Sequence, residues 1–226
     1  MIPSGGNAVM ASRREPPDSL DFFPTPPWAT RAFLRHVLPA LGGACPPIRS
    51  AWDPCCGEGH MAEVLRESIV QVRASDIFDY GRGYEVGDFL DAVAPAVRCC
   101  DLICANPPFK PAAQFARRAF QLAPVVAFLL RAQWLEGEDR YETILRDRPP
   151  TLYAPFVERV CMLRGRWEPK GSTATAYAWF VWVEGAAPLP PFFIPPGRKH
   201  ALTRPDDARR FGARTDAPLL DPMDPA

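Results

Sequence analysis

Short apolar runs alternate along this chain with stretches in which apolar residues recur every three or four positions. Residues 28–41 show the second pattern, because Ala29, Phe33, Val37 and Leu41 follow one another at helical spacing. The same criteria predict further helices at 60–68 and 112–123, and strands at 48–53, 69–76, 101–106 and 125–130. This alternation predicts an α/β fold, a doubly wound sheet with helices on both faces.

Two further β-rich runs, at 157–163 and 174–184, are separated by a loop that contains glycine. They predict an antiparallel hairpin as the last part of the sheet. The folded domain is therefore expected to span residues 21–185. Residues 1–20 are expected to form a flexible N-terminus, and residues 186–226, which are rich in proline, an extended C-terminal tail.

The charge of the chain limits its partners. Its 226 residues carry 26 basic and 26 acidic side chains, so the formal net charge is zero. Proteins that bind nucleic acid over a broad surface are usually basic, so any such contact here must be a local patch. The seven cysteines show no C-x-x-C spacing, which argues against a metal site and fits reduced thiols in a cytoplasmic protein. We expect no signal peptide and no membrane span.

The segment AWDPCCGEGHMAEVL, residues 51–65, combines a strand end, a glycine turn and a helix start. Gly57 and Gly59 would let the backbone approach a ligand closely, and the free N–H groups of the helix start could face it. Asp53, at the strand end, would repel a pyrophosphate but attract an ammonium or sulfonium group. The segment therefore favours S-adenosylmethionine over a nicotinamide dinucleotide. A turn that merely needs glycine is the simpler alternative.

Two more carboxylates extend this candidate site. Asp76 ends the second predicted strand and can accept hydrogen bonds from both hydroxyls of a ribose. Asp88 could accept a hydrogen bond from an adenine amino group. Each has a structural alternative, which is a helix N-cap for Asp76 and a turn residue for Asp88.

The stretch DLICANPPFK, residues 101–110, ends a predicted strand with an amide, two prolines and an aromatic ring. Ligands of doubly wound sheets bind at such strand ends. If the substrate is an exocyclic amino group of a base, the Asn106 side-chain carbonyl and the Pro107 backbone carbonyl can each accept one of its hydrogens. The nitrogen lone pair then faces an electrophilic methyl group. Pro107 and Pro108 would fix this geometry in advance, and Phe109 would stack on a flipped base. A strand end followed by a Pro-Pro turn is the simpler alternative.

Three motifs taken together, DFFPTPP, DPCCGEG and NPPF, resemble the amino-methyltransferases of DNA, in particular N6-adenine methyltransferases of phage or prophage type. The resemblance covers roughly residues 21–185, and the motif order is similar to the family's gamma arrangement. It implies a Rossmann-like methyltransferase fold with a mostly parallel seven-stranded sheet and a C-terminal antiparallel hairpin. It also implies methyl transfer from S-adenosylmethionine to the N6 amino group of adenine in duplex DNA, with the base flipped and stacked on Phe109.

The motifs and the resemblance together assign residues to three roles. The expected catalytic residues are Asn106, Pro107, Pro108 and Phe109. The expected cofactor-binding residues are Phe23, Pro24, Thr25, Pro26, Asp53, Pro54, Cys55, Gly57, Gly59, Asp76, Ile77 and Asp88. The expected nucleic-acid contacts are Lys110, Arg164, Arg166, Trp167 and Lys170.

The chain departs from the family at several points. The family often has tyrosine where Phe109 stands, and His60 and Met61 replace the usual aromatic residue after the glycine loop. There is no clear target-recognition domain. Residues 131–175 mix acidic with basic side chains, so a DNA contact and a solvated face are equally good interpretations of this stretch.

Other functions stay open at this point. The same chemistry fits cytosine N4, RNA or a protein glutamine amide. A nicotinamide-dependent oxidoreductase could use the spacing of Gly57, Gly59 and Ala62, but it leaves the NPPF stretch unexplained. Cys55 as a nucleophile for cytosine C5 methylation lacks a supporting segment downstream. A degenerate prophage protein that only binds S-adenosylmethionine or DNA is a further alternative. We expect a monomer.

Overall fold

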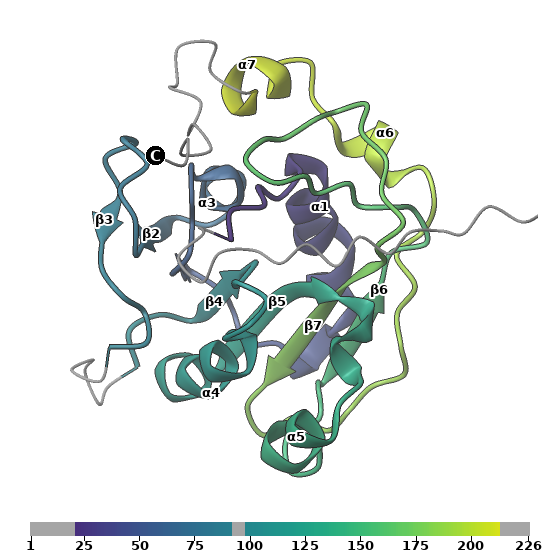
Figure 1. Ribbon diagram of the computed structural model, residues 1–226. Coiled ribbons are helices and arrows are strands. Elements are labelled where there is room, and N and C mark those ends of the chain that lie inside the picture. Colours follow the sequence, from purple (N-terminus) through teal and green to yellow (C-terminus); the bar gives the residue numbers. More distant parts are fainter. Residues whose placement is uncertain (1–20, 92–97, 213–226) are drawn as a thin grey trace, which may run out of the picture.

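The computed structural model describes residues 21–91 and 98–212, and its centre is a seven-stranded sheet with the order β3-β2-β1-β4-β5-β7-β6 (Figure 1). The strands are β1 Ser50–Asp53, β2 Gln71–Asp76, β3 Glu85–Val86, β4 Leu102–Ala105, β5 Val125–Arg131, β6 Leu152–Pro155 and β7 Tyr177–Val183. Neighbouring strands from β3 to β5 are parallel, whereas β7 is antiparallel to both β5 and β6. The expected α/β fold, with a mostly parallel sheet and antiparallel pairing at its end, is confirmed.

Helices cover both faces of the sheet (Figure 1). One face carries a continuous helical stretch formed by α1 Pro27–Ala32, η1 Phe33–Val37 and α2 Leu38–Ala40, followed by the short turn η2 Gly42–Ala44, and it also carries α3 His60–Leu65. The other face carries α4 Ala112–Leu122, and η3 Ala132–Leu135, α5 Glu138–Arg140 and η4 Tyr141–Leu145 follow β5. The three predicted helices therefore form. Within the described ranges, no helix is both long and apolar enough to cross a membrane.

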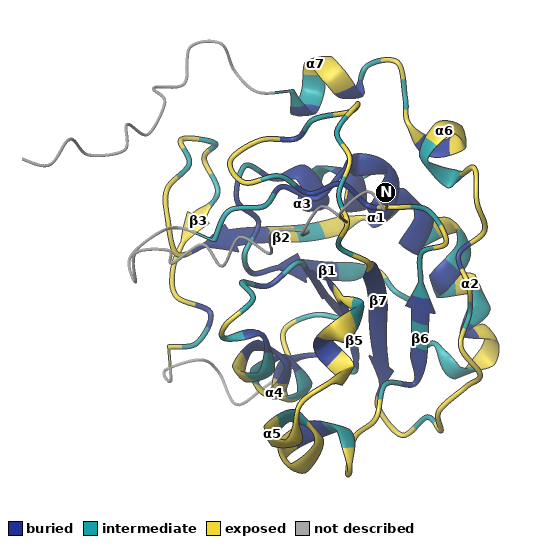
Figure 2. Ribbon diagram, turned by 45° about the vertical axis from the view of Figure 1, so that its right-hand side comes forward, coloured by how far each residue is buried: buried dark blue, intermediate teal, exposed yellow. Residues whose placement is uncertain are grey.

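The uninterrupted apolar run of β5 follows from this layering. Its alternate residues belong to two hydrophobic cores, with Val125, Ala127 and Leu129 on the side of α1 and α3, and Val126, Phe128 and Leu130 on the side of α4. A strand covered on both faces carries apolar residues without alternation. The neighbouring β7 is likewise buried along its whole length (Figure 2).

The strand predicted at 157–163 is wrong. The partner of β7 is β6, which comes earlier, with Leu152 opposite Val181 and Pro155 opposite Ala178. Residues 152–155 and 157–163 are both short and rich in apolar residues, so the hydrophobic pattern alone does not show which of them pairs with β7. In the structure Val160 and Met162 are buried against the core without joining the sheet.

The described part of the expected extended C-terminal tail is attached to the domain. Leu189, Phe192 and Ile194 donate backbone hydrogen bonds to carbonyls of 151–155, so the proline-rich stretch runs along the edge of β6. Two short helices follow, α6 Arg198–Leu202 and α7 Asp207–Phe211, and they lie near α1 and α3 (Figure 1). The expectations for residues 1–20 and 213–226 lie outside the described residues.

A buried arginine attaches these C-terminal helices to the domain. Arg31 of α1 is only 2% exposed, and its guanidinium donates two hydrogen bonds of 2.7 Å to the carboxylate of Asp207. It donates two more, of 2.8 and 2.9 Å, to Glu67 and one of 2.8 Å to the Leu202 carbonyl. Burial alone would lower the pKa of Arg31, but the two carboxylates raise it, so the group stays charged.

Replacing Asp207 tests this attachment. We expect Asp207→Ala to lower the free energy of unfolding by about 3–5 kcal/mol, because it leaves a buried guanidinium half unpaired. Urea denaturation followed by circular dichroism measures the loss. The control is Asp206→Ala, since Asp206 is the preceding residue and lies 4.0 Å from its nearest arginine nitrogens. We expect that change to cost at most about 1 kcal/mol. Equal losses in both variants would contradict this account of α7.

Candidate functional site

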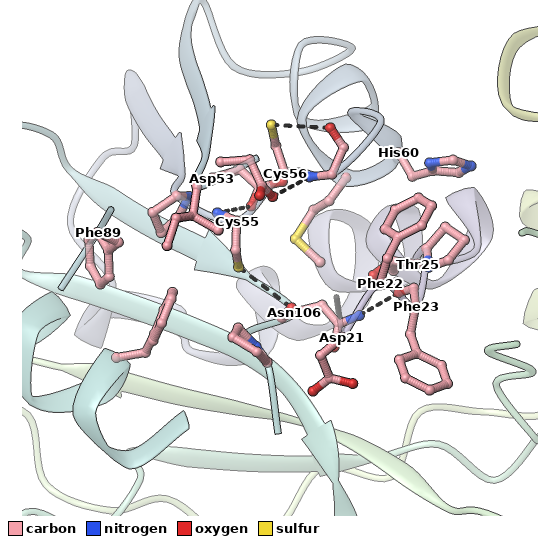
Figure 3. A pocket seen from close by; sticks show the side chains of 18 of the residues that line it. Asp21, Phe22, Phe23, Thr25, Asp53, Cys55, Cys56, His60, Phe89 and Asn106 are labelled. Atoms are coloured by element: carbon pink, nitrogen blue, oxygen red, sulfur yellow. Dashed lines mark hydrogen bonds between the residues drawn. The ribbon is translucent and has the colours of Figure 1, made fainter. Parts of the chain in front are cut away.

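A cavity of about 250 Å³ lies at the carboxyl ends of β1, β2 and β4 (Figure 3). Parallel strands bring these ends to the same edge of the sheet, which is where doubly wound folds bind ligands. Most of the residues assigned from the sequence line this cavity: Phe23, Pro24, Thr25, Asp53, Pro54, Cys55, Gly57, Asp76, Ile77, Asp88, Asn106 and Pro108. Pro26, Gly59, Pro107 and Phe109 are their chain neighbours and lie outside the lining.

The glycine turn is shaped by aromatic neighbours as well as by its backbone. Gly57 and Gly59 have φ values of 54° and 88°, in the left-handed region that favours glycine. A Cβ on Gly57 would lie 2.5 Å from the ring of Phe22, and one on Gly59 would lie 1.9 Å from the Tyr84 hydroxyl oxygen. Both positions thus disfavour any larger residue, independently of a ligand.

Two carboxylates face this turn from neighbouring strands. Asp53 is 1% exposed, and burial raises its pKa to about 8, with the nearby charge of Asp76 adding to the rise. Burial also raises the pKa of Asp76, although its carboxylate accepts hydrogen bonds from the N–H groups of Gly57 (2.8 Å) and Phe78 (3.1 Å). An ionised carboxylate has about four acceptor positions, so Asp76 keeps free positions for a ligand. The cavity is thus suited to a ligand that carries a positive charge and hydroxyl groups.

Asp88 has the turn role that the sequence allowed, and it also lies at the cavity. Its carboxylate accepts the N–H of Leu90 at 2.8 Å, which is the geometry of a turn aspartate, and its side chain also lines the cavity. Ile77, which lies beside Asp76, is 63% exposed at the cavity wall. These two residues form the polar and apolar parts of one end of the site.

Asn106 follows β4 and is held in one orientation. Its Nδ2 donates to the Phe23 carbonyl at 2.8 Å (Figure 3). The same nitrogen approaches the Met162 sulfur at 3.5 Å. Because the nitrogen is engaged, Oδ1 is the atom left over, and it has no hydrogen-bond partner among the described residues. The Asn106 side chain therefore presents an acceptor at the cavity.

Asp21 completes this arrangement, and sequence reasoning missed it. Its carboxylate accepts the backbone N–H of Phe109 at 2.7 Å. Residues 21–25, the N-terminal segment, thus contact the NPPF stretch at two points, through Asp21 and through the Phe23 carbonyl. Asp21 is the first residue of the DFFPTPP motif, and that position could have indicated a role at the site.

Other lining residues were also missed, among them Phe22, His60, Tyr80 and Phe89. His60 is the most informative of these. Burial lowers the pKa of its imidazole, and Nε2 lies 2.9 Å from the Phe211 carbonyl of α7. Its Nδ1 is buried and has no hydrogen-bond partner within residues 21–91 and 98–212. The C-terminal helix therefore contacts a residue of the cavity wall.

The expected nucleic-acid contacts fall into two groups. Lys110, Arg164, Arg166 and Lys170 are exposed, the last three on the connection between β6 and β7. Trp167 is different, because it is 6% exposed and packs against Phe211 and Val64. As α7 covers it, Trp167 cannot stack on a base in this structure.

No family model matches this chain, and no curated protein sequence matches it. A Listeria monocytogenes structure assigned to the class I S-adenosylmethionine-dependent methyltransferases superposes with a TM-score of 0.51 at 12% identity. The alignment covers 77% of this chain and 66% of that chain, which is just under two thirds of it. The fold is a Rossmann-like methyltransferase fold.

Two further structures are similar at lower scores. One is assigned as an RNA methyltransferase of Pyrococcus horikoshii, with a TM-score of 0.49 and 14% identity over 69% of this chain and 83% of that one. The other is a type I restriction-modification methyltransferase subunit of Streptococcus thermophilus, with a TM-score of 0.48 and 12% identity over 70% and 43%. TM-scores below 0.5 add no weight to the fold assignment.

Two glycine-to-alanine variants test whether crowding fixes the glycine turn. Gly59 and Gly83 both have positive φ, but a Cβ on Gly83 would meet nothing within 4 Å. We expect Gly83→Ala to lower the free energy of unfolding by about 1–2 kcal/mol, the cost of the left-handed conformation. Gly59→Ala should cost about 1–3 kcal/mol more, because its Cβ collides with Tyr84. Urea denaturation measures both, and equal costs would show that Tyr84 imposes no steric limit.

Proposed function

We propose that this protein transfers a methyl group from S-adenosylmethionine to the exocyclic N6 amino group of adenine in DNA. The observation that carries the proposal is the oriented amide of Asn106, whose free Oδ1 lies at the end of β4 beside the acid-lined cavity. The methyltransferase fold and the motif resemblance support the reaction class, and the acceptor rests on the resemblance.

The cavity residues fit S-adenosylmethionine by their chemistry. Asp53 is a buried carboxylate that lacks a cationic hydrogen-bond partner among the described residues, and a sulfonium or ammonium group would supply the missing charge. Asp76 has acceptor positions left for ribose hydroxyls. Asp88, Phe89 and Ile77 offer an acceptor and apolar surface for an adenine ring. When bound, the cofactor supplies an electrophilic methyl group.

The residues around Asn106 would orient the substrate amine. Asn106 Oδ1 and the Pro107 carbonyl would accept its two hydrogens, so that the lone pair faces the methyl group. The Phe23 carbonyl keeps the Asn106 amide from rotating, and Asp21 holds the N–H of Phe109. Neither a covalent nucleophile nor a strong base is needed, because the methylated amine can lose its proton to solvent.

Nucleoside mass spectrometry tests this reaction. Purified protein is incubated with unmethylated duplex DNA and isotopically labelled S-adenosylmethionine, and the hydrolysed nucleosides are analysed. We expect labelled N6-methyladenine from the wild type. Asn106→Ala should slow its formation by about 10²–10³-fold, as when one oriented polar group is removed, with unchanged affinity for the cofactor.

The matched control is Gln114→Ala, which removes an exposed amide on α4 and should leave the rate unchanged. Detection of labelled N4-methylcytosine instead would show that the acceptor is cytosine and not adenine. If a preparation binds S-adenosylmethionine but yields no labelled nucleoside, the proposal that the protein methylates DNA is wrong. Parallel incubations with RNA and with a glutamine-containing protein would then identify the acceptor.

Cofactor affinity should depend on pH through Asp53. A cationic ligand favours the ionised carboxylate, but a pKa of about 8 keeps Asp53 mostly protonated at pH 7, so binding must release a proton. We expect the affinity to rise by about tenfold per pH unit from about pH 6, and to level off near pH 8. Calorimetry in buffers of different ionisation enthalpy measures the affinity and the proton release. Asp53→Asn should bind more weakly and without this pH dependence. A wild-type affinity that is flat over the same range would contradict the role of Asp53.

A further inference from the structure

Arg131 is the last residue of β5, and it lies over the aromatic residue of the NPPF stretch. Its guanidinium carbon is 3.9 Å from the centroid of the Phe109 ring. Phe23 lies against the same ring, with the centroids 5.2 Å apart. Phe109 is half-buried, and Arg131 is exposed. A planar cation therefore already covers part of the ring that a flipped base would use.

Among the described residues Arg131 has no carboxylate partner, which sets it apart from a similar arginine. Arg73 lies at 4.0 Å over the Trp52 ring and is paired with Glu85 through two hydrogen bonds. No ion pair of Arg131 is found within 21–91 and 98–212. The carboxylate of Asp21, which also lies at the NPPF stretch, accepts the Phe109 N–H. The side chain of Arg131 also interacts with the Tyr177 hydroxyl, which is uncharged at neutral pH, so no carboxylate of the described residues compensates the charge of Arg131.

A base cannot stack on a ring face that a guanidinium occupies. If the target base takes that face, Arg131 must leave it, but the side chain is tethered to the end of β5 and stays near the nucleotide. The closest group of opposite charge is then a phosphate of the nucleic-acid backbone. Guanidinium groups bind phosphates with paired hydrogen bonds, and an exposed arginine loses little hydration in making that exchange.

We propose that Arg131 binds a backbone phosphate beside the flipped nucleotide, and that it covers Phe109 until the base arrives. This inference rests on the proposed function, because it needs a nucleic-acid substrate. It adds a specific cation, in direct contact with Phe109, to the exposed residues expected from the sequence.

The salt dependence of DNA binding tests this role. Fluorescence anisotropy gives the Kd for a labelled duplex at several KCl concentrations, and the slope of log Kd against log salt counts phosphate contacts. We expect Arg131→Gln to weaken binding and to reduce that slope by about one. Arg131→Lys should keep the slope, because it keeps the charge. The affinity for S-adenosylmethionine should be unchanged in both variants.

Arg148→Gln is the matched control. Arg148 also lies over an aromatic ring, Phe120 at 4.8 Å, but its backbone carbonyl is bonded to Trp182 and it is remote in the fold from the NPPF stretch. It should bind DNA with the slope of the wild type. An unchanged slope in Arg131→Gln, or an equal reduction in Arg148→Gln, would overturn the inference and leave the proposed function intact. A wild type that does not bind duplex DNA would overturn the proposed function and this inference together.

Discussion

The buried ion pairs of Arg31 hold together parts of the chain that are far apart in sequence. The guanidinium joins α1 to Glu67 after α3 and to Asp207 in α7. Residues 21–25 lead directly into α1, so the position of that helix sets the course of the segment. The Phe23 carbonyl of the segment in turn holds the Asn106 amide. The segment that orients the candidate catalytic residue therefore continues into a helix that this charge cluster anchors.

Much of this site could be predicted because it follows from local rules. A buried strand that ends in a polar residue places that residue at the edge of a parallel sheet, and three strands do so with Asp53, Asp76 and Asn106. The tight turn after β1 needs residues that accept positive φ, and the chain supplies Gly57 and Gly59 there. Neither inference requires knowledge of distant contacts, so the sequence was sufficient for both.

The features that the sequence did not reveal depend on distant contacts. Arg31 lies in an apolar helical stretch and Asp207 in a polar one 176 positions later, and only the fold places them 2.7 Å apart. Docking of α7 then buries Trp167, which in the sequence resembled an exposed stacking residue next to Arg166. The choice between 152–155 and 157–163 as the last partner strand was decided by pairing with β7, which hydrophobic pattern does not encode. The contact of Arg131 with Phe109 likewise depends on the strand order, which places β5 next to β4.

Because the chain has no net charge, individual cations near the site matter more for attracting an anionic substrate. A protein with zero net charge gains little from long-range attraction to DNA, so its affinity must come from contacts made at close range. Several arginines of the helical layer are already engaged, since Arg204 and Arg210 bind Glu67 as Arg31 does. Under the proposed function, cations close to the NPPF stretch would therefore supply much of the attraction to nucleic acid. Arg131 is the cation that touches the NPPF stretch itself, so a substrate that reaches Phe109 must also reach this charge.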